Sequence, residues 1–226
     1  MSFEAALRLT EILLALALIQ QSLEHLRAAG RDRLLFAARI VLCGLVISGV
    51  AAPWPLFGLA ALSLVILQRY QGPYNGGSDR MGLLALWCVT LAEVLPAPQW
   101  RELAFGYLGL QLVLSYLISG WVKVVNPDWR SGRALADVFR FSAYPVAEDL
   151  RRLADRPRLL RAASWSVMGF ELALPLTLVS QPMLIAGLAV AAAFHLANAC
   201  LFGLNRFFWT WLAAYPAILW LQARFF

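Results

Sequence analysis

The sequence has few charged residues. They make up 14% of its 226 residues, whereas hydrophobic residues make up 61%, and the mean hydropathy is +0.68. Soluble domains have about 25% charged residues, which they need to cover a surface that faces water. The shortage of charge therefore excludes an ordinary soluble domain. It indicates a chain that places most of its side chains in a lipid bilayer.

Cysteine and histidine are also scarce, and neither is grouped. Cys43, Cys88 and Cys200 lie in three different apolar stretches, without a C-x-x-C pair. The two histidines, His25 and His195, are far apart in the sequence, so a zinc site would lack ligands. We expect buried, unreactive cysteines and no bound metal.

Apolar runs long enough to cross a bilayer recur along the chain, and a transmembrane helix needs about 20 such residues. The runs lie at 6–25, 34–52, 54–69, 81–97, 103–124, 160–180, 183–203 and 206–223. The sequence therefore predicts an all-α, polytopic membrane bundle of about eight transmembrane helices, in a single domain covering residues 1–226.

The net charge of +6 is distributed as in a membrane protein. Nine basic residues lie between the fifth and sixth predicted helices, from Lys123 to Arg161, and most others lie in the first, third and seventh connections. Basic connections of membrane proteins stay in the cytoplasm. We expect the large basic connections to be cytoplasmic, the lipid membrane to be the partner of the chain, and no nucleic acid to be bound.

The longest polar segment runs from about residue 126 to 159. Leu135, Val138 and Phe139 share one face of a short predicted helix, and the piece that begins at Pro145 is also amphipathic. Short arginine-rich amphipathic helices lie in the membrane interface. We expect an interfacial insertion that either fills a gap between helices or covers a cavity.

The single lysine, Lys123, lies at the end of the apolar stretch 104–125, and the other eighteen basic residues are arginine. Arginine stays protonated, whereas a buried lysine can lose its proton and act as a base. A lysine at the end of a membrane helix also commonly extends to the interface without a chemical role. The position of Lys123 leaves both interpretations open.

Polar side chains precede Lys123 on its own predicted helix. Gln111, Ser115 and Ser119 come before it at intervals of four residues, which places all four side chains on one face. This polar stripe predicts that the helix faces the inside of the protein.

The next two predicted helices carry Glu171 and, one turn apart, His195 and Asn198. Charged groups are costly in a bilayer unless they are paired or face a cavity. We predict that Lys123, Glu171 and His195 converge in one buried polar pocket. Lys123 would be a base there, provided that no carboxylate holds it in its charged form. Structural alternatives are an ion pair of Glu171 with Arg39, and interhelical hydrogen bonds from His195 and Asn198.

Four segments match a known pattern in the same order. They are YNGGSD at 74–79, YLISGWVK at 116–123 followed by Trp129 and Gly132, FEL at 170–172, and F-H-x-x-N-x-x-L-F at 194–202. Together they resemble the HTTM family, the membrane domain of vitamin K-dependent gamma-carboxylases and their bacterial relatives. The resemblance covers roughly residues 65–215.

This resemblance implies a reduced, vitamin K-like quinone as cofactor. In the carboxylases, oxygenation of the hydroquinone yields a strong base that removes a proton from a peptide glutamate, and carbon dioxide then adds. The resemblance implies that Lys123 is the base that starts this chemistry. We expect Glu171 and His195 to adjust or relay its proton. The residues that we expect to bind the ligand are Asn75, Gln111, Ser119, Trp129 and Asn198.

The sequence departs from the carboxylase pattern at three points. It does not include the large substrate-binding domain that follows the membrane domain in the carboxylases. Gly77 stands where they have a histidine, and Val122 stands where they have the other member of a lysine pair. We therefore expect a separate partner protein to supply the role of the large domain.

Two functions are open. The first is an HTTM-like protein of a bacterial inner (cell) membrane that binds a lipophilic quinone-like molecule and carries out carboxylase- or epoxidase-like base chemistry. The alternative is a non-enzymatic assembly, export or immunity component whose buried polar residues only hold helices together. The substitution Lys123→Arg separates the two, because arginine keeps the charge but cannot act as a base.

Overall fold

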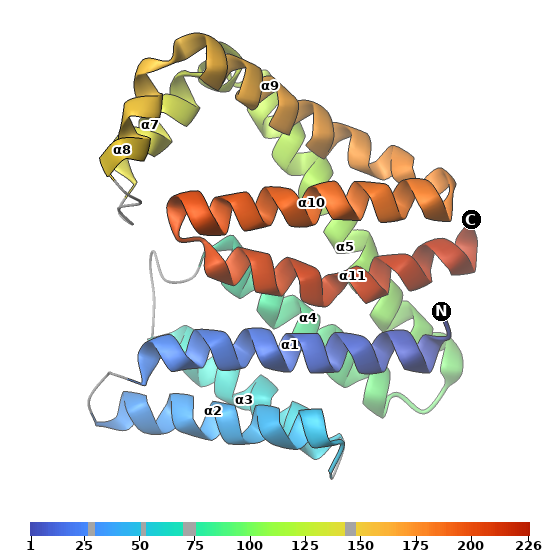
Figure 1. The fold of residues 1–226 in the computed structure, drawn as a ribbon. Coiled ribbons are helices and arrows are strands. Elements are labelled where there is room, and N and C mark those ends of the chain that lie inside the picture. The colour runs from blue at the N-terminus through green and yellow to red at the C-terminus, as the bar shows by residue number, and fades with distance from the viewer. Residues whose placement is uncertain (27–29, 51–52, 70–75, 143–147) are drawn as a thin grey trace. The chain divides into compact units, whose positions relative to one another are not determined.

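The computed structural model describes residues 1–26, 30–50, 53–69, 76–142 and 148–226 (Figure 1). Every regular element in these ranges is helical, so the all-α prediction is confirmed there. The elements are α1 (Phe3–His25), α2 (Arg31–Ser48), α3 (Trp54–Arg69), α4 (Gly77–Val94), α5 (Pro98–Val125), α6 (Pro127–Ser131), α7 (Arg133–Phe141), α8 (Glu148–Arg151), η1 (Arg152–Asp155), α9 (Pro157–Ala173), η2 (Leu174–Val179), α10 (Gln181–Phe202) and α11 (Asn205–Phe225).

Among the described residues, three helical segments are long and apolar enough to cross a membrane. They are α5, the continuous segment Pro157–Val179 formed by α9 and η2, and α10. The helix α3 is apolar but has only 16 residues, while α2 and α4 each contain at least three charged residues. The described helices therefore support a membrane protein, but they do not confirm the predicted count of eight spans.

The chain divides into two compact units. Unit 1 comprises residues 1–110 and 206–225, and unit 2 comprises residues 111–205 with the terminal Phe226. The first part of α5 belongs to unit 1 and its last fifteen residues, 111–125, belong to unit 2. That the whole chain acts as one domain stays a prediction.

In unit 1, α1 and α2 lie side by side (Figure 1). Gly49 ends α2 in a left-handed conformation, with φ at 73°. The last carbonyls of a helix have no partner within it, and here Arg8 of α1 supplies one. Its guanidinium donates to Val46 O at 2.8 Å and to Ile47 O at 2.6 Å. A side chain of α1 thus completes the end of α2.

In unit 2, α9 packs closely against the last part of α5. The contact is made at Gly120, where an added Cβ atom would lie 3.0 Å from Glu171 Cβ and 3.1 Å from Leu172 N. Near the end of α9, Pro175 lacks the N–H that an α-helix needs, and the chain continues as the 3₁₀ helix η2. A glycine on α5 therefore lets the two backbones approach and brings Glu171 next to α5.

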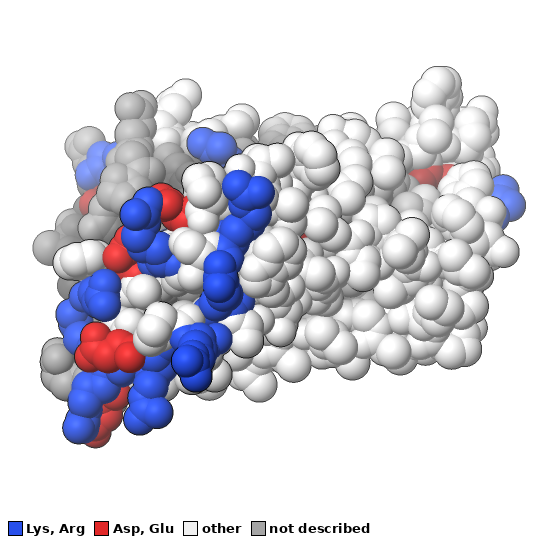
Figure 2. Space-filling view, turned by 90° about the horizontal axis from the view of Figure 1, so that it is seen from above, with Lys and Arg blue, Asp and Glu red and all other residues white. Residues whose placement is uncertain are grey.

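The predicted insertion between the fifth and sixth spans is a series of short helices, α6, α7, α8 and η1. Phe139 of α7 is buried against Phe202 of α10, with ring centroids 4.9 Å apart. Charged side chains gather at the end of unit 2 where α7 and α8 lie, and a long uncharged stretch adjoins them (Figure 2). The exposed arginines of this segment and the start of α9 are Arg130, Arg133, Arg140, Arg152, Arg156, Arg158 and Arg161.

Candidate functional site

Lys123 lies in the last turn of α5 and contacts both oxygens of one carboxylate. Its Nζ atom is 2.8 Å from Oε1 and 2.7 Å from Oε2 of Glu171 on α9. The side chain of Glu171 is 3% exposed and that of Lys123 is 15% exposed. A buried carboxylate needs a cation or hydrogen-bond donors, and Lys123 supplies the cation directly.

Ser119 joins the two charged groups. It lies one helical turn before Lys123, so the two side chains share a face of α5. Its hydroxyl donates to Glu171 Oε1 at 3.1 Å and accepts from Lys123 Nζ at 2.5 Å. Lysine, serine and glutamate therefore form a closed triangle of hydrogen bonds, made possible by the close approach of α5 and α9 at Gly120.

Trp129 covers Lys123 from the segment that follows α5. The Nζ atom lies 5.4 Å from the centre of the indole ring, within the range of a cation–π contact. The backbone carbonyl of Trp129 accepts a hydrogen bond from Ser164 Oγ of α9 at 2.6 Å. Gly132, with φ at 84°, passes so close to Arg161 of α9 that an added Cβ would lie 2.7 Å from its backbone nitrogen. The turn that carries Trp129 is thus fixed to α9.

A second polar contact involves Tyr116, which lies on α5 before Ser119 and Lys123. The hydroxyl of Tyr116 and Nε2 of His195, on α10, are 2.9 Å apart, and both side chains are buried. Aromatic rings surround the pair, with Phe170 against Tyr116 and Phe194 against His195. Tyr116 lies three residues before Ser119, so this pair is one turn of α5 away from the Lys123 triangle.

The structure brings together four of the predicted site residues, namely Ser119, Lys123, Trp129 and Glu171. His195 is on α10 and contacts Tyr116, which lies about one turn before Ser119 on α5. Within their own units, Glu171 pairs with Lys123 and Arg39 donates to Gln21, so each has a partner other than the one named in the structural alternative. The catalytic and binding roles stay predictions.

Three other predicted site residues are not part of this triangle. Two of them, Gln111 and Asn198, lie elsewhere in unit 2, and the third is not among the described residues. Gln111 is half-buried on α5, twelve residues before Lys123, which corresponds to about 18 Å along a helix. Asn198 is half-buried on α10, and its carbonyl accepts from Leu204 N at 3.3 Å where that helix ends. Asn75 lies outside the described residues.

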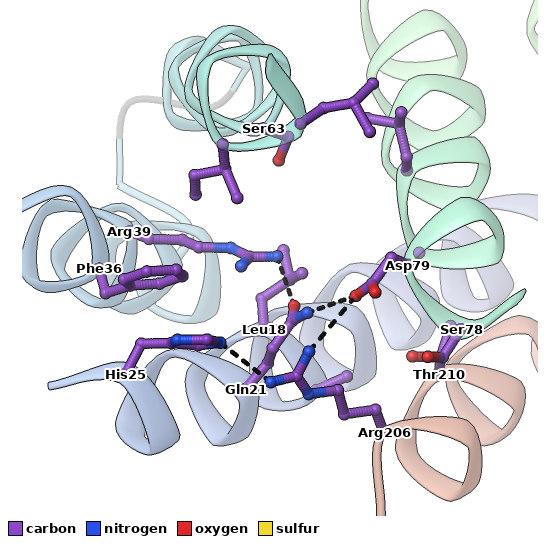
Figure 3. Close-up of a pocket in the computed structure, with 15 residues that line it drawn as sticks. Leu18, Gln21, His25, Phe36, Arg39, Ser63, Ser78, Asp79, Arg206 and Thr210 are labelled. Carbon is purple, nitrogen blue, oxygen red and sulfur yellow. Dashed lines mark hydrogen bonds and ion pairs between the residues drawn. The ribbon is translucent and has the colours of Figure 1, made fainter. Parts of the chain in front are cut away.

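A polar cluster in unit 1 was not predicted from the sequence. Gln21, Asp79 and Arg206 form a chain of contacts with Arg39 and His25, and all five line a cavity (Figure 3). In the sequence, the position of Arg39 inside a predicted span was the one feature that could have indicated a buried polar cluster. Gln21 and Arg206 are 185 residues apart, and no local spacing connects them.

The helical fold, the apolar spans and the buried ion pair define a class, that of integral membrane proteins built from helices. Within it, the HTTM domain matches residues 91–222, which is more than half of the chain. The chain belongs to the HTTM family, and the resemblance seen in the sequence is confirmed. No curated protein and no solved structure gives a match. The family match includes Lys123, Glu171 and His195.

Proposed function

We propose that this HTTM protein binds a lipophilic, quinone-like molecule beside Lys123 and uses the pair of Lys123 and Glu171 to move a proton. The observation that carries the proposal is the contact of the chain's single lysine with a 3% exposed carboxylate, inside the region matched by the family. Strongly desolvated charge partners of this kind occur preferentially at functional sites.

The residues around Lys123 fit a lipophilic aromatic ligand. The indole of Trp129 offers a flat apolar face next to Nζ. Trp121, Val122 and Val125, at the same end of α5, are each more than half exposed, so this end presents apolar side chains to its surroundings. This end of α5 can therefore contact the lipid in which such a molecule would be dissolved.

Glu171 contacts Lys123 with both oxygens and favours its charged form, so the resting pair does not meet the condition set above for Lys123 as a base. Base chemistry therefore requires that the ammonium first give a proton to Glu171, a step that needs no further residue. Lys123 gives one ammonium proton to Glu171, so that an N–H bond breaks and an O–H bond forms, and both groups become neutral. The free amine then takes a proton from an acidic hydroxyl of the bound molecule, while Ser119 holds the amine in position. When bound, a reduced quinone supplies that hydroxyl and, with molecular oxygen, the oxidising chemistry of the carboxylase reaction.

The proposal includes the arrangement in the membrane. The chain spans a bacterial inner membrane about eight times, with its basic connections in the cytoplasm and α6 to η1 in the interface. The arginines gathered around α7 and α8 support this orientation. A separate protein presents the substrate whose proton is removed.

The test uses the protein in lipid nanodiscs with menaquinone hydroquinone and oxygen, and the quinone epoxide is measured by chromatography. We expect Lys123→Arg to lower the rate roughly 100-fold or more, as for loss of a general base, while bound quinone, measured by mass spectrometry, is retained. The matched control Arg158→Lys exchanges the same residue types at an exposed position and should leave the rate unchanged.

Two results would overturn the proposal. One is full activity of Lys123→Arg, because arginine cannot give up its proton. The other is the absence of quinone binding and epoxide formation in the natural protein, combined with unfolding of Lys123→Met. That outcome would leave the buried pair with a structural role alone.

A further inference from the structure

Unit 1 contains a cavity of about 60 Å³. It lies at the end of the unit where α1 ends and where α2, α4 and α11 begin, and Ser63 of α3 faces it from the opposite side (Figure 3). About four water molecules would fill such a volume, at roughly 15 Å³ each. Its polar lining includes Gln21, His25, Arg39, Ser63, Asp79 and Arg206.

Arg39 is the unusual member of this lining. The residue is 5% exposed, and one of its terminal nitrogens donates to Gln21 Oε1 at 2.9 Å. Its Nε atom is buried and has no hydrogen-bond acceptor among the described residues. No carboxylate of the described chain lies within ion-pair distance of this guanidinium. A buried charge in this condition needs an anion.

The acidic neighbours are already engaged elsewhere. Asp79 Oδ1 accepts from Gln21 Nε2 at 2.5 Å and lies 3.9 Å from Arg206. Arg206 also donates to Glu24 Oε2 at 2.8 Å and to Nε2 of His25 at 2.9 Å. The amide of Gln21 thus stands between Arg39 and Asp79, with its oxygen toward the cation and its nitrogen toward the carboxylate (Figure 3).

We propose that this cavity binds a phosphate group, with Arg39 as its main partner. Arg206 is paired with Glu24, whereas the Arg39 guanidinium lines the cavity without an ion-pair partner among the described residues, so the positive charge at Arg39 favours an anion. Guanidinium groups bind phosphate oxygens through paired N–H donors. The hydroxyls of Ser63, Ser78 and Thr210 line the same cavity and add donors. The volume fits one phosphate group, either free or as the headgroup of an anionic phospholipid.

The experiment measures thermal unfolding of the purified protein at constant ionic strength while inorganic phosphate replaces chloride. A ligand that binds the folded state raises the unfolding temperature in a saturable way. We expect this for the natural protein and for Arg80→Gln, which removes an exposed arginine next to Asp79 that does not line the cavity. Arg39→Gln should need at least roughly tenfold more phosphate for half the effect.

A second arm identifies the source of the phosphate. The protein is placed in nanodiscs of phosphatidylcholine with or without phosphatidylglycerol, and the same variants are compared. Stabilisation by phosphatidylglycerol but not by free phosphate, lost in Arg39→Gln, assigns the site to a lipid headgroup. An equal response of the natural protein and Arg39→Gln in both arms, or no response in either, overturns the proposal.

If Arg39→Gln does not fold, the variant Asp79→Asn tests phosphate binding in its place. This change leaves Arg39 in place and removes the one negative charge of the lining, so phosphate should bind more tightly, with half-saturation at least a few-fold lower. Unchanged or weaker binding would contradict the proposal. Both arms probe unit 1 and do not depend on the quinone chemistry proposed for unit 2.

Discussion

In the described part of each unit a cation lies between helices, Lys123 partly buried in unit 2 and Arg39 buried in unit 1, and the two cations have different partners. In unit 2, Lys123 meets both oxygens of Glu171, and Ser119 closes the triangle. In unit 1, Arg39 meets the neutral amide of Gln21, which stands between it and Asp79. The first cation is fully paired within the protein, whereas the second retains donors that the described chain does not use. A paired group is suited to internal proton transfer, and an unpaired one to binding an anion.

The largest effect is expected when the ion pair of Lys123 and Glu171 is broken. Glu171→Leu leaves the ammonium of Lys123 without its carboxylate, and we expect a loss of about 3 kcal/mol in the free energy of unfolding. Unfolding by detergent titration measures this loss. The double variant Lys123→Met, Glu171→Leu should recover much of it, because no unpaired charge remains. Equal losses in the single and double variants would show that the unpaired ammonium of Lys123 is not the cause of the loss.

The next largest effect is expected from Gly120, where the close approach of α5 and α9 brings Lys123 and Glu171 together. Gly120→Ala adds a Cβ atom 3.0 Å from Glu171 Cβ and 3.1 Å from the backbone of Leu172, so the helices must separate. We expect a loss of about 2 kcal/mol. The control Gly169→Ala, on α9 with open space around it, should gain up to about 1 kcal/mol from helix propensity. Similar results for both glycines would contradict the role of Gly120.

A smaller effect concerns the second polar contact of unit 2. Tyr116→Phe removes the hydroxyl that lies 2.9 Å from His195 Nε2 and should cost about 1 kcal/mol of unfolding free energy. The same change at Tyr107, which is 48% exposed on α5 within unit 1, should have almost no effect. Both effects are measured by detergent titration. Equal effects of the two substitutions would contradict a stabilising hydrogen bond between Tyr116 and His195.

The smallest effect is expected for the unpaired cation. In phosphate-free buffer, Arg39→Met loses one hydrogen bond to a neutral amide and relieves a buried charge, so the free energy of unfolding should change by less than about 1 kcal/mol. A loss as large as that of Glu171→Leu would show that Arg39 is paired as firmly as Lys123. The contrast between the two units would then fail.

The sequence predicted the helical membrane class, since composition and the length of apolar runs carry that information. The convergence of Lys123, Glu171 and His195 was predicted from the cost of charged groups in a bilayer, and the structure places Lys123 against Glu171 but His195 against Tyr116. The sequence did not predict that Ser119 bonds to both Lys123 and Glu171, because the approach of α5 and α9 depends on Gly120. The cluster of Gln21, Asp79 and Arg206 was missed for a related reason. Its members come from helices far apart in the chain, and only tertiary packing brings them together.

The contact of Arg8 with the end of α2 has a consequence for the order of assembly. The last carbonyls of a helix need partners from outside that helix, and those of Val46 and Ile47 depend on a side chain that is synthesised about forty residues earlier. The last turn of α2 is therefore complete only when α1 is already beside it. The pair of α1 and α2 is therefore the smallest fragment in which this end of α2 is closed, and a nascent chain cut before α2 is paired with α1 should fray at Val46 and Ile47.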